Sequence, residues 1–223
     1  METKPNKIVM PAHPTNRWSR YGQKIEYIVL HYVGAVSSAK NNGEYFANTA
    51  NLGASAHYFV DETTVVSSVP LQESAGHCGV DYSGARAPFW GKCCNRNSIG
   101  IEMCCKKDSR GNWYIEPETV HNALALVKTL MQRYGIDAGH VVRHYDVCWK
   151  ICPEPWVRDE SQWRAFQQRL EETNTQPKWY ETSGEWAEAK KLGITDGTRP
   201  EDQATRAEVA AMVLRAKKLE ARP

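Results

Sequence analysis

Glu26-Tyr-Ile-Val-Leu-His-Tyr-Val33 is the stretch of sequence that decides the fold, because its β-branched and aromatic side chains predict a buried strand. A second strand is predicted at Ser98-Ile-Gly-Ile-Glu-Met103, where polar and apolar residues alternate. Side chains two residues apart lie on one face of a strand, so Ser98, Gly100 and Glu102 share the face opposite the three apolar residues. We expect these two strands, which are far apart in the chain, to belong to one sheet.

Helical patterns lie between and after these strands. Helices are predicted over residues 36–52, over residues 117–134 and over residues 163–170. A hairpin is predicted over residues 57–66 and a short strand over residues 141–144. Strands that alternate with helices indicate an α/β fold with a central β-sheet flanked by helices, and the hairpin indicates a mixed sheet rather than an all-parallel one.

A polar stretch that ends in proline, Glu172-Thr-Asn-Thr-Gln-Pro177, predicts a domain boundary. We therefore expect a larger domain over residues 1–175 and a small α-helical domain over residues 178–223. In the small domain, Thr205 and Glu208 have the spacing of a helix capping box. Because this segment has few apolar anchors, we expect it to pack against the larger domain or against another chain.

The composition is that of a globular protein without a dominant charge. The 223 residues include 28 Lys and Arg and 26 Asp and Glu, so the formal net charge is +2. This balance argues against nucleic-acid binding, which usually needs a dense cationic surface. The apolar runs are too short to cross a bilayer and the first residues lack an apolar stretch, so neither a membrane span nor a signal peptide is expected. Residues 1–22, with three prolines, are expected to form an extended lead-in.

The cysteine count is seven, an odd number, so these residues cannot all pair within one chain. Without an export signal, we expect most of them to be small, buried and reduced side chains. The sequence leaves open the redox state, or a second metal, for six of them: Cys78, Cys93, Cys94, Cys104, Cys105 and Cys148.

The seventh cysteine and two histidines are candidate metal ligands. His31 lies near the end of the first predicted strand, His144 lies at the end of a later one, and Cys152 follows eight residues further on. Two neutral imidazoles and a thiolate are typical zinc ligands, and a catalytic zinc site keeps its fourth position open. Spacing alone leaves open a packing role for each residue, and Cys152 with His144 as its base also fits a cysteine nucleophile.

Four motifs of the larger domain occur in the order of a known family. In chain order they are Tyr27-Ile-Val-Leu-His31-Tyr, Ser55-Ala-His-Tyr-Phe-Val60-Asp, Asn97-Ser-Ile-Gly-Ile-Glu102, and Arg143-His144-Tyr-Asp followed by Lys150-Ile-Cys152-Pro153. Over residues 25–170 the chain resembles the zinc-dependent N-acetylmuramoyl-L-alanine amidases, a type shared by phage lysozyme-amidases, bacterial anhydro-muropeptide amidases and peptidoglycan recognition proteins.

The resemblance implies a role for each residue that matches the family's motifs. It implies three ligands for one Zn²⁺ ion: His31, His144 and Cys152. Glu102 matches the acidic residue that is the general base in part of the family. Other members use a tyrosine in the second motif, where this chain has Ala56, so Glu102 is the remaining candidate. Lys150 matches the lysine, two residues before the last ligand, that stabilises the oxyanion.

These residue types suit amide hydrolysis. Zinc can bring the pKa of bound water to about 7 and polarise the carbonyl group. Glu102 could take the proton from water and pass it to the leaving amine. Lys150 would add a positive charge where the oxyanion develops, a kind of contribution worth about 3 kcal/mol in well-studied cases.

Three further residues are candidate substrate contacts. His57, in the second motif, either lines the substrate groove or packs in the interior. His77 and Trp90 lie in the long connection over residues 72–97, and a connection of that length is often functional. Indoles suit the faces of sugar rings but are also common in cores. The same alternatives apply to Trp113, Trp149 and Trp156.

The small domain resembles a single S-layer homology repeat. Its matching segments are Trp186-Ala, Leu192-Gly-Ile-Thr-Asp-Gly197 and Thr205-Arg-Ala-Glu208. Such repeats imply attachment to secondary cell-wall polymers, usually by several copies together. A single copy therefore predicts either a homo-oligomer formed through this domain or a repeat that docks on the larger domain.

The function implied by the resemblance is hydrolysis, in bacterial peptidoglycan, of the bond between the lactyl group of N-acetylmuramic acid and L-alanine. Without an export signal, a phage or prophage endolysin is expected, which stays in the cytoplasm until it is released to the cell wall. The alternatives are a bacterial autolysin of the same activity and a non-catalytic peptidoglycan-binding module. The complete set of matching site residues argues against the module.

Overall fold

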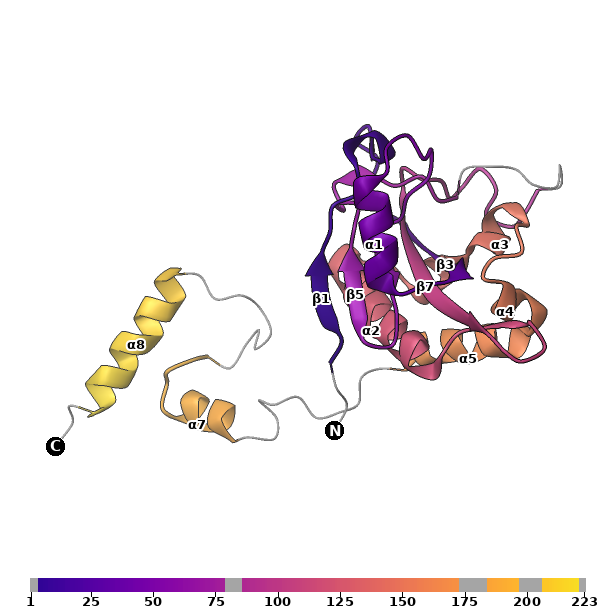
Figure 1. The fold of residues 1–223 in the computed structure, drawn as a ribbon. Coiled ribbons are helices and arrows are strands. Elements are labelled where there is room, and N and C mark those ends of the chain that lie inside the picture. The colour runs from indigo at the N-terminus through magenta and orange to yellow at the C-terminus, as the bar shows by residue number, and fades with distance from the viewer. Residues whose placement is uncertain (1–3, 79–85, 173–183, 197–205, 221–223) are drawn as a thin grey trace. The chain divides into compact units, whose positions relative to one another are not determined.

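The computed structural model describes residues 4–78, 86–172, 184–196 and 206–220 (Figure 1). The chain forms two compact units, Met1–Glu172 and Thr173–Pro223. The boundary expected at residues 172–177 lies outside the described residues after Glu172.

The first unit is built on a mixed β-sheet, to which the described residues contribute seven strands. They are β1 (Asn6–Val9), β3 (Tyr27–Val36), β4 (Tyr58–Val60), β5 (Thr64–Ser67), β7 (Ser98–Lys107), β8 (Trp113–Tyr114) and β9 (Val141–Arg143). The order is β1-β5-β4-β7-β3-β9, and β8 pairs with β7. The β4–β5 and β7–β8 pairs are antiparallel and the other neighbours are parallel, so the prediction of a mixed sheet is confirmed. A separate ribbon joins β2 (Trp18–Ser19) to β6 (Glu73–Ser74).

Helices cover both faces of this sheet (Figure 1). Helix α1 (Ala39–Asn48) packs on one face, and α2 (Pro117–Tyr134) and α5 (Glu160–Glu171) pack on the other. Short helices α3 (His144–Cys148) and α4 (Glu154–Arg158) follow β9, and 3-10 turns cover Pro14–Asn16 and Ala138–His140. Helix α2 has the predicted bounds, because Pro117 suits the first turn and Gly135 takes up the left-handed conformation (φ 66°) that ends the helix.

Alternation along β7 decides which side chains enter the main core. Ile99, Ile101 and Met103 are fully buried against α2 and α5. The core is closed by three aromatic side chains whose ring centroids lie 4.9 to 5.9 Å apart: Trp156, Trp163 and Phe166. Ser98, Gly100 and Glu102 therefore face away from this core, as predicted, because successive side chains of a strand point to opposite faces.

Three sequence predictions about individual elements were wrong. The lead-in is not merely extended, because β1 adds to the sheet edge beside β5. Helix α1 begins at Ala39 rather than at residue 36, because β3 continues to Val36 and the Ser38 side chain caps the helix. The strand β9 ends at Arg143, so His144 opens a helix. Trp156, for which the sequence left a cleft or a core position open, is buried in the core.

The second unit contains helices α7 (Glu185–Lys191) and α8 (Arg206–Glu220). The Arg215 guanidinium donates a hydrogen bond of 3.1 Å to the carbonyl oxygen of Ile194. Helix α8 leaves three apolar side chains about half exposed: Val209, Val213 and Leu214. Thr205 of the expected capping box and Gly197 of the repeat-like motif lie outside the described residues.

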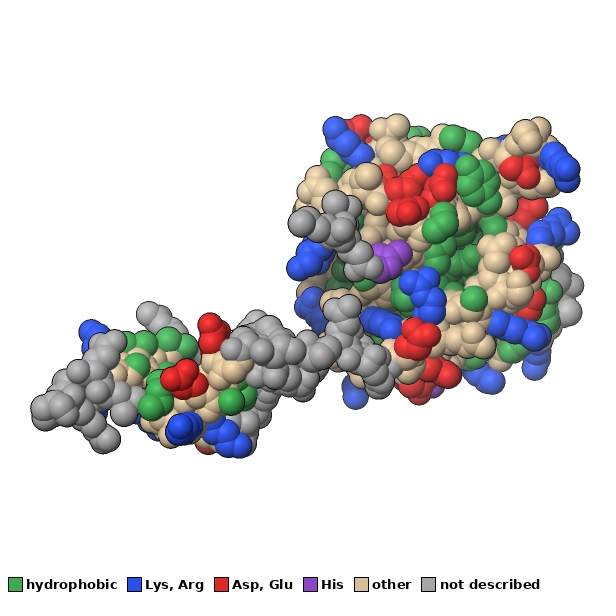
Figure 2. Space-filling model, turned by 90° about the horizontal axis from the view of Figure 1, so that it is seen from below, with side chains coloured by type: hydrophobic (Ala, Val, Ile, Leu, Met, Phe, Trp, Pro, Cys, Tyr) green, Lys and Arg blue, Asp and Glu red, His purple; other side chains and the backbone are tan. Residues whose placement is uncertain are grey.

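Surface charge and hydropathy agree with the composition. On the face shown in Figure 2, acidic and basic side chains are interspersed around hydrophobic ones, as a net charge of +2 leads us to expect. Among the described residues, no helix combines the length and the apolar character that crossing a bilayer would require.

Candidate metal centre

Two neighbouring parallel strands position His31 and Glu102. His31 on β3 is directly opposite Glu102 on β7 in the sheet register. Opposed residues of paired strands point to the same face, so both side chains leave the sheet on the side away from the main core. Leu30 and Ile101, the preceding pair in the register, are fully buried in that core on the other side. Burial of Leu30 and Ile101 on one face of the sheet thus directs the side chains of the next residues, His31 and Glu102, to the other face.

His144 reaches the same place from the other neighbour of β3. Strand β9 pairs with β3 through Arg143, and His144 is the first residue of α3. The Arg143 guanidinium anchors this turn, because it donates to both carboxylate oxygens of Asp146, at 2.9 and 3.1 Å, and to the carbonyl oxygen of Trp156, at 3.0 Å. The carbonyl oxygen of Cys152 accepts from the amide of Tyr145 at 2.9 Å, which ties the loop that follows α3 back to this helix.

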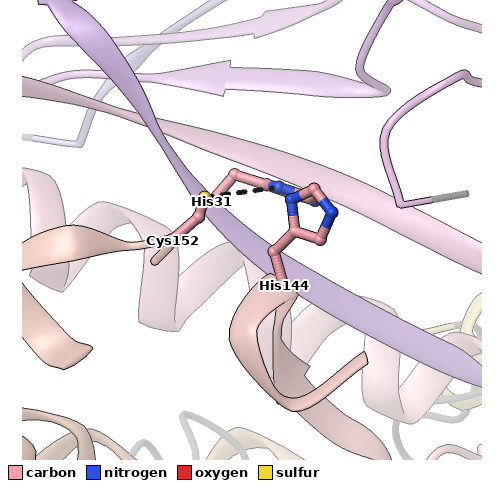
Figure 3. Close-up of side chains that lie close together, drawn as sticks. All are labelled: His31, His144 and Cys152. Carbon is pink, nitrogen blue, oxygen red and sulfur yellow. Dashed lines mark hydrogen bonds between the residues drawn. The ribbon is translucent and has the colours of Figure 1, made fainter. Parts of the chain in front are cut away.

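His31, His144 and Cys152 converge into one buried group, with one potential ligand atom from each residue within 4.8 Å of the others (Figure 3). The Nδ1 atom of His31 lies 3.7 Å from the Sγ atom of Cys152. Zinc–nitrogen and zinc–sulfur bonds of about 2.0 and 2.3 Å at a tetrahedral angle place the two donor atoms about 3.5 Å apart. The donors and their separation therefore fit a zinc ion.

Burial sets the protonation of these three groups. Burial and the adjacent rings of His144 and His77 hold the pKa of His31 well below its usual range. Burial also lowers the pKa of His144, to about 3, so both imidazoles are neutral at neutral pH and keep a lone pair for a cation. Burial raises the pKa of the Cys152 thiol, and a cation that replaces its proton would compensate the buried charge.

Glu102 contributes a buried acid beside this group. Its Oε2 atom is enclosed and has no hydrogen-bond partner within the described part of the chain. Burial raises the pKa of this carboxyl group to about 8, and the positive charge of Lys150 opposes that rise. Such an orphaned oxygen, on the strand position opposite the candidate ligand His31, is typical of a reactive site rather than of a structural one.

A cavity of about 150 Å³ lies beside His31 and Glu102. His31, His77, Glu102 and the exposed Lys150 line it, together with Asn42 and Phe46 of α1. Ala56 also lines the cavity and offers no proton-transferring group, so Glu102 remains the candidate base that the resemblance implies.

The candidate substrate contacts have different surroundings. His57 is fully buried; its Nδ1 atom accepts from the amide of Gly100 at 3.0 Å, and its Nε2 atom lies 3.2 Å from the carbonyl oxygen of Glu73. Of the two alternatives left open for His57, its burial in the interior fits packing. His77 lines the cavity, whereas Trp90 is half-buried and is not part of the cavity wall.

The cysteines other than Cys152 remain thiols in this structure. All seven are unpaired as disulfides, and Cys94 is the one that is partly accessible rather than buried. Cys78 and Cys93 belong to a small apolar cluster with Val29 and Val142.

Comparison with known proteins identifies a family whose matched region contains this candidate metal centre. The family model described as N-acetylmuramoyl-L-alanine amidase (Amidase_2) matches residues 21–155, which include all five residues around the candidate centre. The chain belongs to the N-acetylmuramoyl-L-alanine amidase family. It is 38% identical over 173 residues to the amidase CwlL of Bacillus licheniformis, an alignment that covers 74% of this chain and 47% of CwlL.

A second curated relative and two solved structures agree with this assignment. The amidase BlyA of Bacillus subtilis is 35% identical over 169 residues, or 70% of this chain and 45% of BlyA. The solved structure of PlyL has a TM-score of 0.60 at 25% identity and covers 78% of this chain and 100% of PlyL. The catalytic domain of XlyA has a TM-score of 0.58 at 28% identity, with 74% and 99% covered. The fold is thus that of these amidases, although the chain spans about half the length of the curated relatives it matches.

Sequence reasoning missed two residues that shape this amidase-family site. Arg143 was noted only as part of a motif, yet its hydrogen bonds hold the turn that carries His144. Asn42 lies four residues before Phe46, so helical spacing predicts that the two share a face, and both line the cavity. A polar residue on the apolar face of a short helix was the signal available for Asn42.

Proposed function

We propose that this chain is a zinc-dependent hydrolase that cuts the amide bond between N-acetylmuramic acid and L-alanine in bacterial peptidoglycan. The observation that carries the proposal is the convergence of His31, His144 and Cys152 beside the orphaned carboxyl oxygen of Glu102 in a chain of the amidase family. Zinc would be held by the two imidazoles and the thiolate, and it would supply the Lewis acidity that activates water and polarises the scissile carbonyl.

Glu102 is the proposed general base and acid. A carboxyl group with the usual pKa is too weak a base to take a proton from water efficiently. A carboxyl group whose pKa is raised by burial can both accept a proton and donate it near neutral pH. Glu102 would accept the proton of the attacking water and then donate it to the departing amine of L-alanine. The Lys150 ammonium, at the open side of the same cavity, would stabilise the negative charge that develops on the carbonyl oxygen.

A cysteine hydrolase that uses Cys152 and His144 is less consistent with these surroundings. A nucleophilic cysteine needs a lowered pKa and access to the substrate. Cys152 is buried and its pKa is raised. A non-catalytic binding module would have no use for the orphaned Glu102 carboxyl group, whose burial is unfavourable unless it acts on a ligand.

The biological setting that we propose is a phage or prophage endolysin, with a bacterial autolysin as the alternative. Endolysin-like structures among the neighbours support this setting. The enzyme would remain in the cytoplasm until it reaches the cell wall. The second unit would act as an S-layer-homology-like repeat that binds secondary cell-wall polymers, alone or as a homo-oligomer.

Metal analysis combined with mass spectrometry of digested cell walls tests the proposal. The protein should contain one zinc ion per chain, and the fragments should carry a free amino group on L-alanine and an intact lactyl group. His31→Ala should lose both the zinc and the lytic activity. Metal-independent activity that survives chelators, or products cut within the glycan or the peptide, would show that the proposal is wrong.

A further inference from the structure

A chain of hydrogen bonds connects His31 to the first residue of β7. The Nε2 atom of His31 lies 3.0 Å from the Nδ1 atom of His77. The Nε2 atom of His77 lies 3.1 Å from the Oγ atom of Ser98, and this hydroxyl donates to the carbonyl oxygen of Cys94 at 2.6 Å. This series of hydrogen bonds uses the Nε2 atom of His31 and leaves the Nδ1 atom, which faces the Sγ atom of Cys152, outside it.

The direction of each hydrogen bond follows from the donors available. A serine hydroxyl has one hydrogen, and a backbone carbonyl can only accept, so the Ser98 hydrogen is committed to Cys94. Ser98 must therefore accept from the Nε2–H of His77. A neutral imidazole carries one N–H, which leaves the Nδ1 atom of His77 as an acceptor for the Nε2–H of His31. His31 then keeps its Nδ1 lone pair towards Cys152.

We propose that His77 is a positioning residue that fixes His31 in the tautomer able to bind metal through Nδ1, with Ser98 as the group that fixes His77. The inference rests on the proposed metal centre and adds to it a function for His77 other than substrate contact. Outer hydrogen bonds of this kind orient ligating histidines and raise their basicity.

The backbone around His77 holds its ring in place for this role. The amides of His77 and Cys78 both donate to the Oδ1 atom of Asn95, at 2.8 Å each. On the other side, the ring lies flat against Gly100 of β7. A Cβ atom on Gly100 would lie 2.6 Å from Cγ and 2.8 Å from Nδ1 of His77, closer than real contacts allow. The glycine of the Ser98-to-Met103 strand therefore makes room for the His77 ring.

Zinc affinity of matched variants tests this role directly. His77→Leu keeps an apolar side chain but removes the acceptor, and His77→Asn restores an acceptor oxygen near the position of Nδ1. Competition with a chelator of known affinity, on the full chain at fixed pH, should show a 10- to 100-fold loss of zinc affinity for His77→Leu. His77→Asn should stay within about 5-fold of the unmodified protein. His121→Ala, at an exposed position on α2, is the control and should not change the affinity.

A purely structural role of His77 predicts a different pattern. Both His77 variants would then lose affinity in parallel with the stability of the metal-free protein, and that result would overturn the inference. Equal affinity of His77→Leu and the unmodified protein would also overturn it. If His77→Leu does not fold, Gly100→Ala replaces it, since it displaces the ring without changing its chemistry and should weaken zinc binding at least 10-fold. An unmodified protein that binds no zinc would instead refute the proposed metal centre.

Discussion

Replacing Glu102 by Gln should stabilise the metal-free protein, and the gain should grow as the pH rises. The carboxyl group is enclosed, its Oε2 atom lacks a hydrogen-bond partner among the described residues, and burial raises its pKa to about 8. A carboxyl whose pKa is raised on folding favours the folded state fully below the unfolded pKa of 4.5, and this advantage is lost as the pH rises towards the folded pKa.

The linkage relation gives the size of the effect. With pKa values of 4.5 unfolded and about 8 folded, ionisation of Glu102 lowers the free energy of unfolding by about 1 kcal/mol at pH 5 and by about 3 kcal/mol at pH 7. Glutamine has nearly the same shape and does not ionise. The difference in unfolding free energy between variant and unmodified protein should therefore increase by roughly 2 kcal/mol between these two pH values.

Urea unfolding in the presence of a chelator, at pH 5 and at pH 7, measures this difference. His31 and His144 titrate in both proteins, so their contributions cancel to first order. Glu171→Gln, at an exposed site near the end of α5, is the control and should show no trend with pH. A constant difference for Glu102→Gln would refute the reasoning. A gain that shrinks with rising pH would refute it more strongly, because Lys150 would then more than compensate the ionised carboxylate and hold its folded pKa below 4.5.

Three further predictions concern activity, the core and the second unit. Lys150→Ala should retain zinc but lower kcat on a soluble muropeptide by about 100- to 1,000-fold, with little change in KM. The reason is that the lysine acts on charge that develops in the transition state. An effect confined to KM would contradict this role. Trp156→Ala should lower the free energy of unfolding, measured by urea denaturation, by about 3 to 5 kcal/mol. The substitution leaves a cavity at a fully buried site beside Trp163 and Phe166. A loss below 1 kcal/mol would mean that neighbouring side chains fill this cavity. Deleting residues 178–223 should reduce sedimentation of the protein with cell walls while cleavage of small soluble muropeptides continues; equal wall binding with and without the segment would refute an anchoring role.

Local pattern was enough to predict the strands that carry the site. The alternation of Ser98 to Met103 correctly placed Glu102 on the face opposite the isoleucines, because a strand offers each residue only two directions. It did not reveal what lies on the Glu102 face, since that depends on residues distant in the chain. His77 illustrates the limit: it follows a two-residue strand, and its contacts with His31, Ser98 and Gly100 all come from other segments.

Predictions of element ends failed where tertiary contacts compete with local preference. The lead-in contains no strong strand pattern, yet β1 pairs with β5 because an open sheet edge offers hydrogen bonds to any extended neighbour. Arg143 ends β9 because its guanidinium is drawn to Asp146 and the carbonyl oxygen of Trp156, which turns the chain into α3. Asp146 is a local partner of Arg143, but neither β5 nor the Trp156 carbonyl oxygen can be chosen as a partner from the local sequence.

The amino-acid order by itself determined which donors this protein can offer and on which side of each strand they stand, because side-chain chemistry and the two-residue repeat of a strand are local properties. Only the folded chain decided that His31, His144 and Cys152 meet within one small volume. That meeting depends on β3 lying between β7 and β9 in a particular register, and the register is selected by burial of apolar side chains from the whole unit at once.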